Sequence, residues 1–252
     1  MAITATHYEL FKSLPLPRGG SLLEIGEANW YGDVDPQMLY VDCSQYHPTG
    51  QESSSDLPAV IKSGNLFAIA KAFYAATFDP ERIVSIDING TAAALRVDLN
   101  DGHAVSEAIR DGDFDVIINH GTAEHVFNIA QVFRTMHDAC EVGGLMVHDA
   151  PFTGWIDHGF YCLHPTLFYD LAQANCYEVV KVAMHEWRSR TIIPVEGRGH
   201  VAKLAKAGAI PKNSMLFVAL RKLYDTPFRV PMQGVYAGTI GEAGERAWEE
   251  LR

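Results

Sequence analysis

Short apolar runs rich in β-branched residues alternate along the chain with longer runs whose apolar residues recur at helical spacing. The first kind predicts strands at 21–25, 82–88, 93–99, 114–119, 143–150, 177–187 and 214–224. The second kind predicts helices at 57–78, 123–141 and 165–175. Strands alternating with helices are typical of a mostly parallel sheet covered on both faces. We therefore expect an α/β, Rossmann-like fold with seven strands, one of them antiparallel at the edge because no clear helix separates the last two.

One polar segment interrupts this alternation early in the chain. Residues 46–58 are polar and contain two prolines, which is typical of a loop. Apolar strand-like segments lie before and after it, so we interpret it as part of one domain. The expected organisation is a single domain over 1–252, with an inserted lid at about 33–57 and a loop insertion at about 186–213.

Composition narrows the class of ligand. The 252 residues carry a formal net charge of −11, which disfavours a nucleic-acid partner because such binding depends on clustered Lys and Arg. No apolar run reaches the roughly 18 residues that span a bilayer, and the first residues do not resemble a secretory signal. The four cysteines are widely spaced, as is typical of reduced thiols. We expect a cytoplasmic protein with a small-molecule substrate and no membrane partner. A homodimer is one alternative for its assembly.

Polar residues or glycine follow the apolar part of four consecutive predicted strands. In an open parallel sheet, ligands bind beyond the carboxyl ends of the strands. Residues at these four ends are Glu24 and Gly26, then Asp87, then Asp98, then Asn119 and His120. Acidic helix caps and turn residues would give a similar pattern without any ligand.

The ordered segments "LLEIG", "IVSIDI", "RVDL", "FDVIINHGTAEHV" and "EVGGLMVHDAPF" resemble the motif series of class I S-adenosylmethionine-dependent methyltransferases over about residues 20–184. This resemblance implies methyl transfer from S-adenosylmethionine to an O, N or S atom of a small metabolite. It implies that Glu24 organises the loop at Gly26 and Ala28 and the ammonium end of the cofactor, and that Gly26 lets the backbone approach the methionine part. It also implies that Asp87 accepts the ribose hydroxyls, and that Asp98 and Leu99 contact adenine. Asn119 and His120 would then lie near the methionine end.

The glycine loop departs from the family pattern. Residues 26–30 read Gly-Glu-Ala-Asn-Trp, so only the first of three glycines is kept. Asp42 is an alternative ribose acid. Alternative functions are a cofactor-binding module without catalysis, aminocarboxypropyl transfer or cyclisation with the same cofactor, and a nicotinamide-dependent oxidoreductase. The GxGxxG motif that is typical of such oxidoreductases is absent after the first predicted strand, which counts against this alternative.

Histidines are concentrated in one part of the chain: His120, His125, His148, His158 and His164 fall within 45 residues. Because an imidazole titrates near neutral pH, His148 or His158 is predicted as a general base. His120, which the resemblance puts near the methyl donor, is the third predicted catalytic group. Glu124 and Asp149 lie among them, so a divalent metal site is an alternative, although no ligand spacing such as HExxH is present and no metal ligand is assigned. Hydrogen-bonded core histidines are the remaining interpretation.

Overall fold

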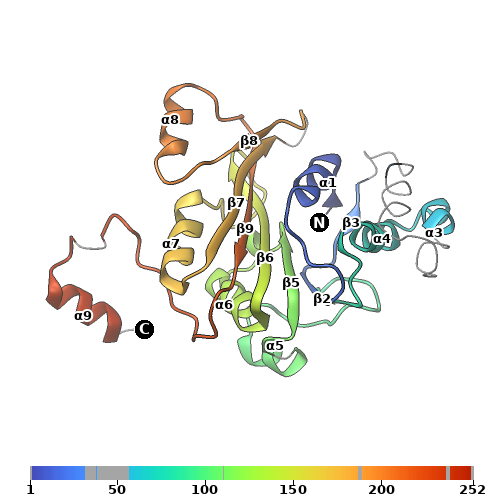
Figure 1. Cartoon of the computed structure of the whole chain (residues 1–252), viewed down its shortest axis with the longest axis horizontal. Helices are drawn as coiled ribbons and strands as arrows, with labels where there is room; N and C mark the ends of the chain where they lie inside the picture. The colour runs from blue at the N-terminus through green and yellow to red at the C-terminus, as the bar shows by residue number, and fades with distance from the viewer. Residues whose placement is uncertain are drawn as a thin grey trace.

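The computed structural model describes residues 2–31, 38, 57–109, 111–186, 189–236 and 239–250. Its centre is a seven-stranded sheet in the order β4-β2-β5-β6-β9-β7-β8 (Figure 1). The strands are β4 (Arg82–Ile86), β2 (Ser21–Ile25), β5 (Phe114–His120), β6 (Cys140–Thr153), β9 (Ser214–Arg221), β7 (Glu178–Glu186) and β8 (Ile192–Pro194). A separate two-stranded sheet pairs β1 (Ala2–Ile3) with β3 (Asn29–Trp30).

Strand direction confirms the predicted fold class. The neighbours β4, β2, β5 and β6 are all parallel. An antiparallel edge strand is present, as expected, but it is β8, which pairs with β7, and not one of the last two predicted strands. A second antiparallel strand, β9, lies inside the sheet between β6 and β7.

Helices cover both faces of the sheet (Figure 1). One face packs against α1 (Ala5–Lys12) and α4 (Leu66–Phe78), which share a core with the odd-numbered residues of β6. The other face packs against α5 (Gly102–Ala108), α6 (Ile129–Ala139) and α7 (Pro165–Asn175). Within the part of the chain that the structure describes, the remaining helices are α3 (Leu57–Ser63), η2 (Ala123–His125), α8 (His200–Lys206) and α9 (Glu242–Glu250). None of the helices in the described ranges is long and apolar enough to span a lipid bilayer.

Several predicted elements differ from the structure. Residues 93–99 are not a strand: only Leu95 forms an isolated parallel bridge, to Ile86. Only residues 87–92 lie between β4 and this segment, which is too few for a parallel crossover with a helix, because such a connection takes at least about 10–12 residues. The predicted helix over 57–78 is two helices, because Gly64 has a φ of +68° and Asn65 caps α4.

The two predicted insertions have different outcomes. Residues 186–213 were expected to form a loop, but they contain β8 and α8. The lid at about 33–57 falls almost entirely outside the described residues, and so does Asp42. The predicted helix over 123–141 also divides, into the single turn η2 and the longer α6.

Alternation along β6 has a direct consequence for the site. Successive side chains of a strand point to opposite faces of its sheet. Met146 and Ala150 belong to the core beneath α6 and α7, whereas Leu145 and Val147 belong to the core beneath α1. His148 and the next residue, Asp149, therefore lie in different layers of the molecule, although they are adjacent in the sequence.

Candidate functional site

The order of the strands reverses between β2 and β5. From β2 the chain moves to β4 on one side, and then crosses back to β5 on the other side. Ligands of open α/β sheets bind beyond the carboxyl ends of the strands at such a reversal, and we call this region of the structure the crevice. The loop at Gly26 and the loop at Thr122 meet there. Gly26 has a φ of +83°, and a Cβ on it would lie 2.0 Å from Thr122 Oγ1. The two loops approach each other so closely that residue 26 has to be glycine, whether or not a cofactor binds beside it.

Glu24 is turned into the protein rather than toward a ligand. Its side chain is buried, forms an ion pair with Lys71, and accepts a hydrogen bond from Ser85 Oγ at 2.5 Å. It also accepts from the backbone N–H of Ala28 at 3.2 Å. These contacts hold the loop after β2 in shape, which is the role that the resemblance implies for this acid.

Asp87 connects the ends of β2 and β4. One carboxylate oxygen accepts from the backbone N–H of Glu27 at 2.9 Å, and the other accepts from Asn89 N–H at 2.8 Å. A carboxylate has about four acceptor positions, so each oxygen can still accept from a ligand hydroxyl. Asp98 is exposed and accepts from Asn100, which lowers its pKa, while Leu99 is buried beside it.

Asn119 and His148 face the layer beneath α6 and α7. The side-chain oxygen of Asn119 accepts from Ala123 N–H at 3.0 Å and so shapes the turn after β5. The His148 ring lies 5.5 Å from Phe133 and 5.0 Å from Phe168, centre to centre. Burial lowers the pKa of His148 to about 3. His148 therefore has the environment of a neutral, packed core residue.

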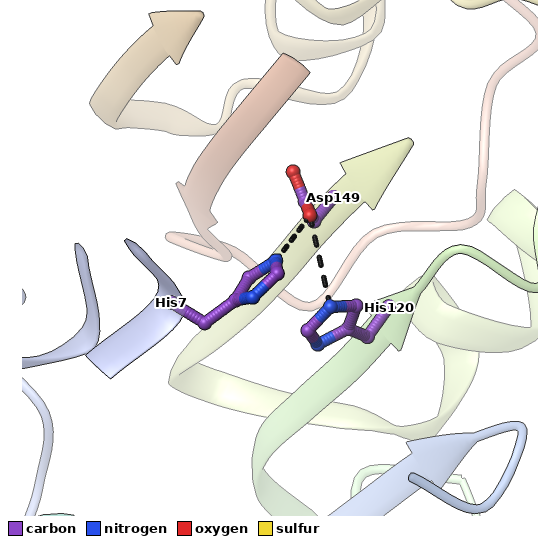
Figure 2. A group of neighbouring side chains, drawn as sticks. All are labelled: His7, His120 and Asp149. Carbon is purple, nitrogen blue, oxygen red and sulfur yellow. Dashed lines mark hydrogen bonds and ion pairs between the residues drawn. The ribbon is translucent and has the colours of Figure 1, made fainter. Parts of the chain in front are cut away.

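A different cluster forms in the opposite layer, between the sheet and α1. Figure 2 shows His7 from α1, His120 from β5 and Asp149 from β6 pointing toward one another. His7 Nε2 lies 2.5 Å from one oxygen of Asp149, and His185 Nε2 lies 2.8 Å from the other. His120 Nε2 is 3.7 Å from the carboxylate. All four side chains are buried, and we call them the histidine–aspartate cluster.

Hydrogen bonding fixes the tautomer of His7. The backbone N–H of Thr4 donates to His7 Nδ1 at 3.0 Å, so Nδ1 carries a lone pair and the proton is on Nε2. That proton is then donated to Asp149. Burial would raise the pKa of Asp149, but His185 and His7 outweigh burial, so that the pKa falls below its usual range. Burial and the neighbouring His7 lower the pKa of His120 well below its usual value.

Glu124 begins a second polar group, at the rim of the crevice. Its side chain is fully buried, and neither carboxylate oxygen has a hydrogen-bond partner among the described residues. Burial raises its pKa to about 8. His158 Nε2 lies 3.6 Å from its Oε1, and His125 Nε2 lies 3.9 Å from the same atom. We call Glu124, His125 and His158 the rim triad.

The structure thus separates the predicted catalytic histidines. His120 belongs to the histidine–aspartate cluster, His158 to the rim triad, and His148 to the core on the other face of the sheet. His7 and His185 were missed, because neither belongs to a motif and they contact Asp149 across 142 and 36 positions of sequence. A buried polar residue on an apolar helix face, as at His7, was the signal available for it.

The chain is similar to solved structures of other proteins at low sequence identity. No protein-family model and no curated protein matches the sequence. Solved structures similar to the chain include S-adenosylmethionine-dependent methyltransferases. The one from Archaeoglobus fulgidus is 12% identical, with a TM-score of 0.45 over 85% of this chain and 94% of that chain. The one from Mesorhizobium loti is 12% identical, with a TM-score of 0.44 over 86% and 98%. The [4+2]-cyclase SpnF is 12% identical, with a TM-score of 0.44 over 86% and 81%. Similarity at this level defines neither a family nor a function.

Proposed function

We propose that the chain is an S-adenosylmethionine-dependent methyltransferase that acts on an O, N or S atom of a small metabolite. The observation that carries this proposal is the position of Asp87 beside the crevice between β2 and β5. Its carboxylate holds the loop after β2 through Glu27 N–H and keeps acceptor capacity on both oxygens. A carboxylate so placed fits the paired hydroxyls of a ribose.

The residues at the ends of β2, β4 and β5 fit the adenosyl part of the cofactor. Asp87 would hold the ribose, and Asp98 with Leu99 would hold the adenine. Gly26, Ala28, Glu24 and Asn119 would act indirectly, by keeping the two loops of the crevice in place. When bound, the cofactor supplies an electrophilic methyl group, so the protein has to align the acceptor atom and remove its proton.

For the proton we propose His120, the histidine at the tip of β5. Its pKa lies well below the usual value, so the ring is neutral at neutral pH and carries a lone pair, and the neighbouring Asp149 carboxylate would stabilise the imidazolium that forms when the ring takes a proton. Its Nδ1 has no hydrogen-bond partner among the residues that the structure describes. We assign no catalytic role to His148, because it faces the other layer.

A cofactor-binding module without chemistry is the main alternative. The rim triad favours an enzyme, because a buried carboxyl group without a hydrogen-bond partner is destabilising by about 1–3 kcal/mol. The net charge of −11 disfavours a nucleic-acid acceptor and in that respect supports a small molecule as the acceptor.

Calorimetric titration with S-adenosylmethionine and S-adenosylhomocysteine tests the proposal. We expect both to bind, and Asp87→Asn to weaken binding by about 10–100-fold, which corresponds to one or two hydrogen bonds to a charged group. The matched control is Asp79→Asn. Asp79 is the left-handed C-cap of α4, a conformation that Asn tolerates, so binding should not change. Absence of binding by the unmodified protein, or equal affinity of Asp87→Asn, overturns the proposal. Binding of NAD instead would favour the oxidoreductase.

A further inference from the structure

The rim triad is assembled from two separate segments. Glu124 and His125 are in η2, directly after β5, and His158 is in the loop that follows β6. Phe160 N–H donates to the backbone oxygen of Glu124 at 2.8 Å and so fastens this loop to η2. A Cβ on Gly159 would lie 3.0 Å from the same oxygen and 3.2 Å from His125 Nδ1. The loop and the turn therefore approach as closely as a glycine allows.

Three potential ligand atoms converge in this group. One oxygen or nitrogen from each of Glu124, His125 and His158 lies within 4.8 Å of the other two. Nitrogen and oxygen ligands at about 2.1 Å from one tetrahedral ion are separated by about 3.4 Å. The measured separations of 3.6 and 3.9 Å exceed hydrogen-bond length and lie slightly above that spacing. Small side-chain rotations would bring the three atoms to one ion.

Glu124 gives the independent indication that a ligand is missing here. Its carboxylate is 0% exposed and both oxygens lack a hydrogen-bond partner among the described residues, whereas the side chains of His125 and His158 are 43% and 33% exposed. A cation entering from the exposed histidine side would reach a carboxylate that is buried behind it. Buried polar groups are normally satisfied, so each exception needs a physical account.

We propose that Glu124, His125 and His158 bind a divalent first-row transition-metal ion. Two imidazoles with one carboxylate form a known set for such ions and leave coordination positions open. The histidine–aspartate cluster is the weaker candidate, because both oxygens of Asp149 already accept hydrogen bonds at 2.5 and 2.8 Å. An oxygen of the acceptor substrate could occupy an open position of the ion; this last step rests on the proposed function, whereas the ion site itself does not.

The test is metal binding by the full chain after removal of bound metal with a chelator. Zn²⁺ and Co²⁺ are titrated by calorimetry, and the visible absorption of Co²⁺ reports its coordination. We expect one ion per chain. Glu124→Gln and His158→Gln should weaken binding by more than about 10–100-fold, the loss caused by removal of an outer partner alone. Glu107→Gln, on an exposed turn of α5, is the matched control and should bind normally.

Two results overturn the inference. One is the absence of stoichiometric binding by the unmodified protein. The other is unchanged affinity in Glu124→Gln and His158→Gln; if Asp149→Asn abolishes binding instead, the ion belongs to the histidine–aspartate cluster. Circular dichroism of each variant is the control for correct folding. S-adenosylhomocysteine binding is measured on the same samples, so failure of the cofactor proposal is recorded separately from failure of the metal proposal.

Discussion

Replacement of His148 by Phe separates a packed histidine from a catalytic one. The ring lies against Phe133 and Phe168, and its polar contact among the described residues is a long approach of 3.4 Å between Asn119 Nδ2 and His148 Nδ1. A phenyl ring has a similar shape and does not titrate. If His148 is neutral in the folded protein, its removal should change how stability depends on pH.

The expected size follows from the pKa of about 3, compared with 6.5 for an unperturbed histidine. Between these two values the unfolded chain binds a proton at this position and the folded chain does not. Stability is therefore lost as the pH falls below about 6.5. At pH 5 the loss reaches about 2 kcal/mol, from 1.36 kcal/mol for each of about 1.5 pH units. His148→Phe should lose about 2 kcal/mol less than the unmodified protein between pH 7.5 and pH 5.

Urea unfolding at pH 7.5, 6.5, 5.5 and 5.0 measures this difference. Any constant destabilisation by the phenyl ring cancels, because only the change with pH is compared. The other titrating groups are present in both proteins. His103→Gln, on the exposed surface of α5, serves as the control for the loss of a histidine that lies outside the core. Parallel stability curves for His148→Phe and the unmodified protein would contradict the assignment of a neutral core residue.

Two further substitutions, Asp149→Asn and Gly26→Ala, test the hydrogen bonds of Asp149 and the packing of the loop after β2. Asp149→Asn removes the charge that accepts hydrogen bonds from His7 and His185, so we expect a loss of about 3 kcal/mol in urea unfolding at pH 7.5; a loss below about 0.5 kcal/mol would refute the network. Gly26→Ala should destabilise by more than the 1–2 kcal/mol or so of a left-handed residue, since its Cβ would meet the loop after β5. Gly64→Ala has a similar φ but open space around it, so its thermal unfolding should show only the backbone effect.

Local patterns predicted most of the sheet. The runs at 21–25, 114–119 and 214–224 combine β-branched residues with short length, and each is a strand in the structure. The run at 93–99 has a similar composition, yet it forms no strand, since pairing depends on chain length after β4 as well as on residue type. The helix α1 shows no strong periodicity, and it is stabilised by packing on the sheet.

The site was harder to predict, because its polar groups meet through tertiary structure. Asp149 was noted as a neighbour of His148, but the alternation of β6 turns these side chains to opposite faces. Strand alternation was readable in the sequence and would have separated them. The approach of His7 from α1 depends on how that helix lies across β5 and β6, which no local pattern specifies. Glu124 and His158 were noted separately, and only the fold of the loop after β6 joins them.

Two unfavourable features coincide in that loop and the turn beside it. Trp155 and Asp157 have φ values of +49° and +59°, and a left-handed conformation at such residues is unfavourable by about 1–3 kcal/mol each. The buried carboxyl group of Glu124, which has no hydrogen-bond partner among the described residues, adds a similar amount. A relaxed loop and an apolar residue at position 124 would be more stable if packing were their only role. The proposed ion would account for both features, because it would bind the Glu124 carboxyl oxygens and the His158 ring that the strained loop brings to them.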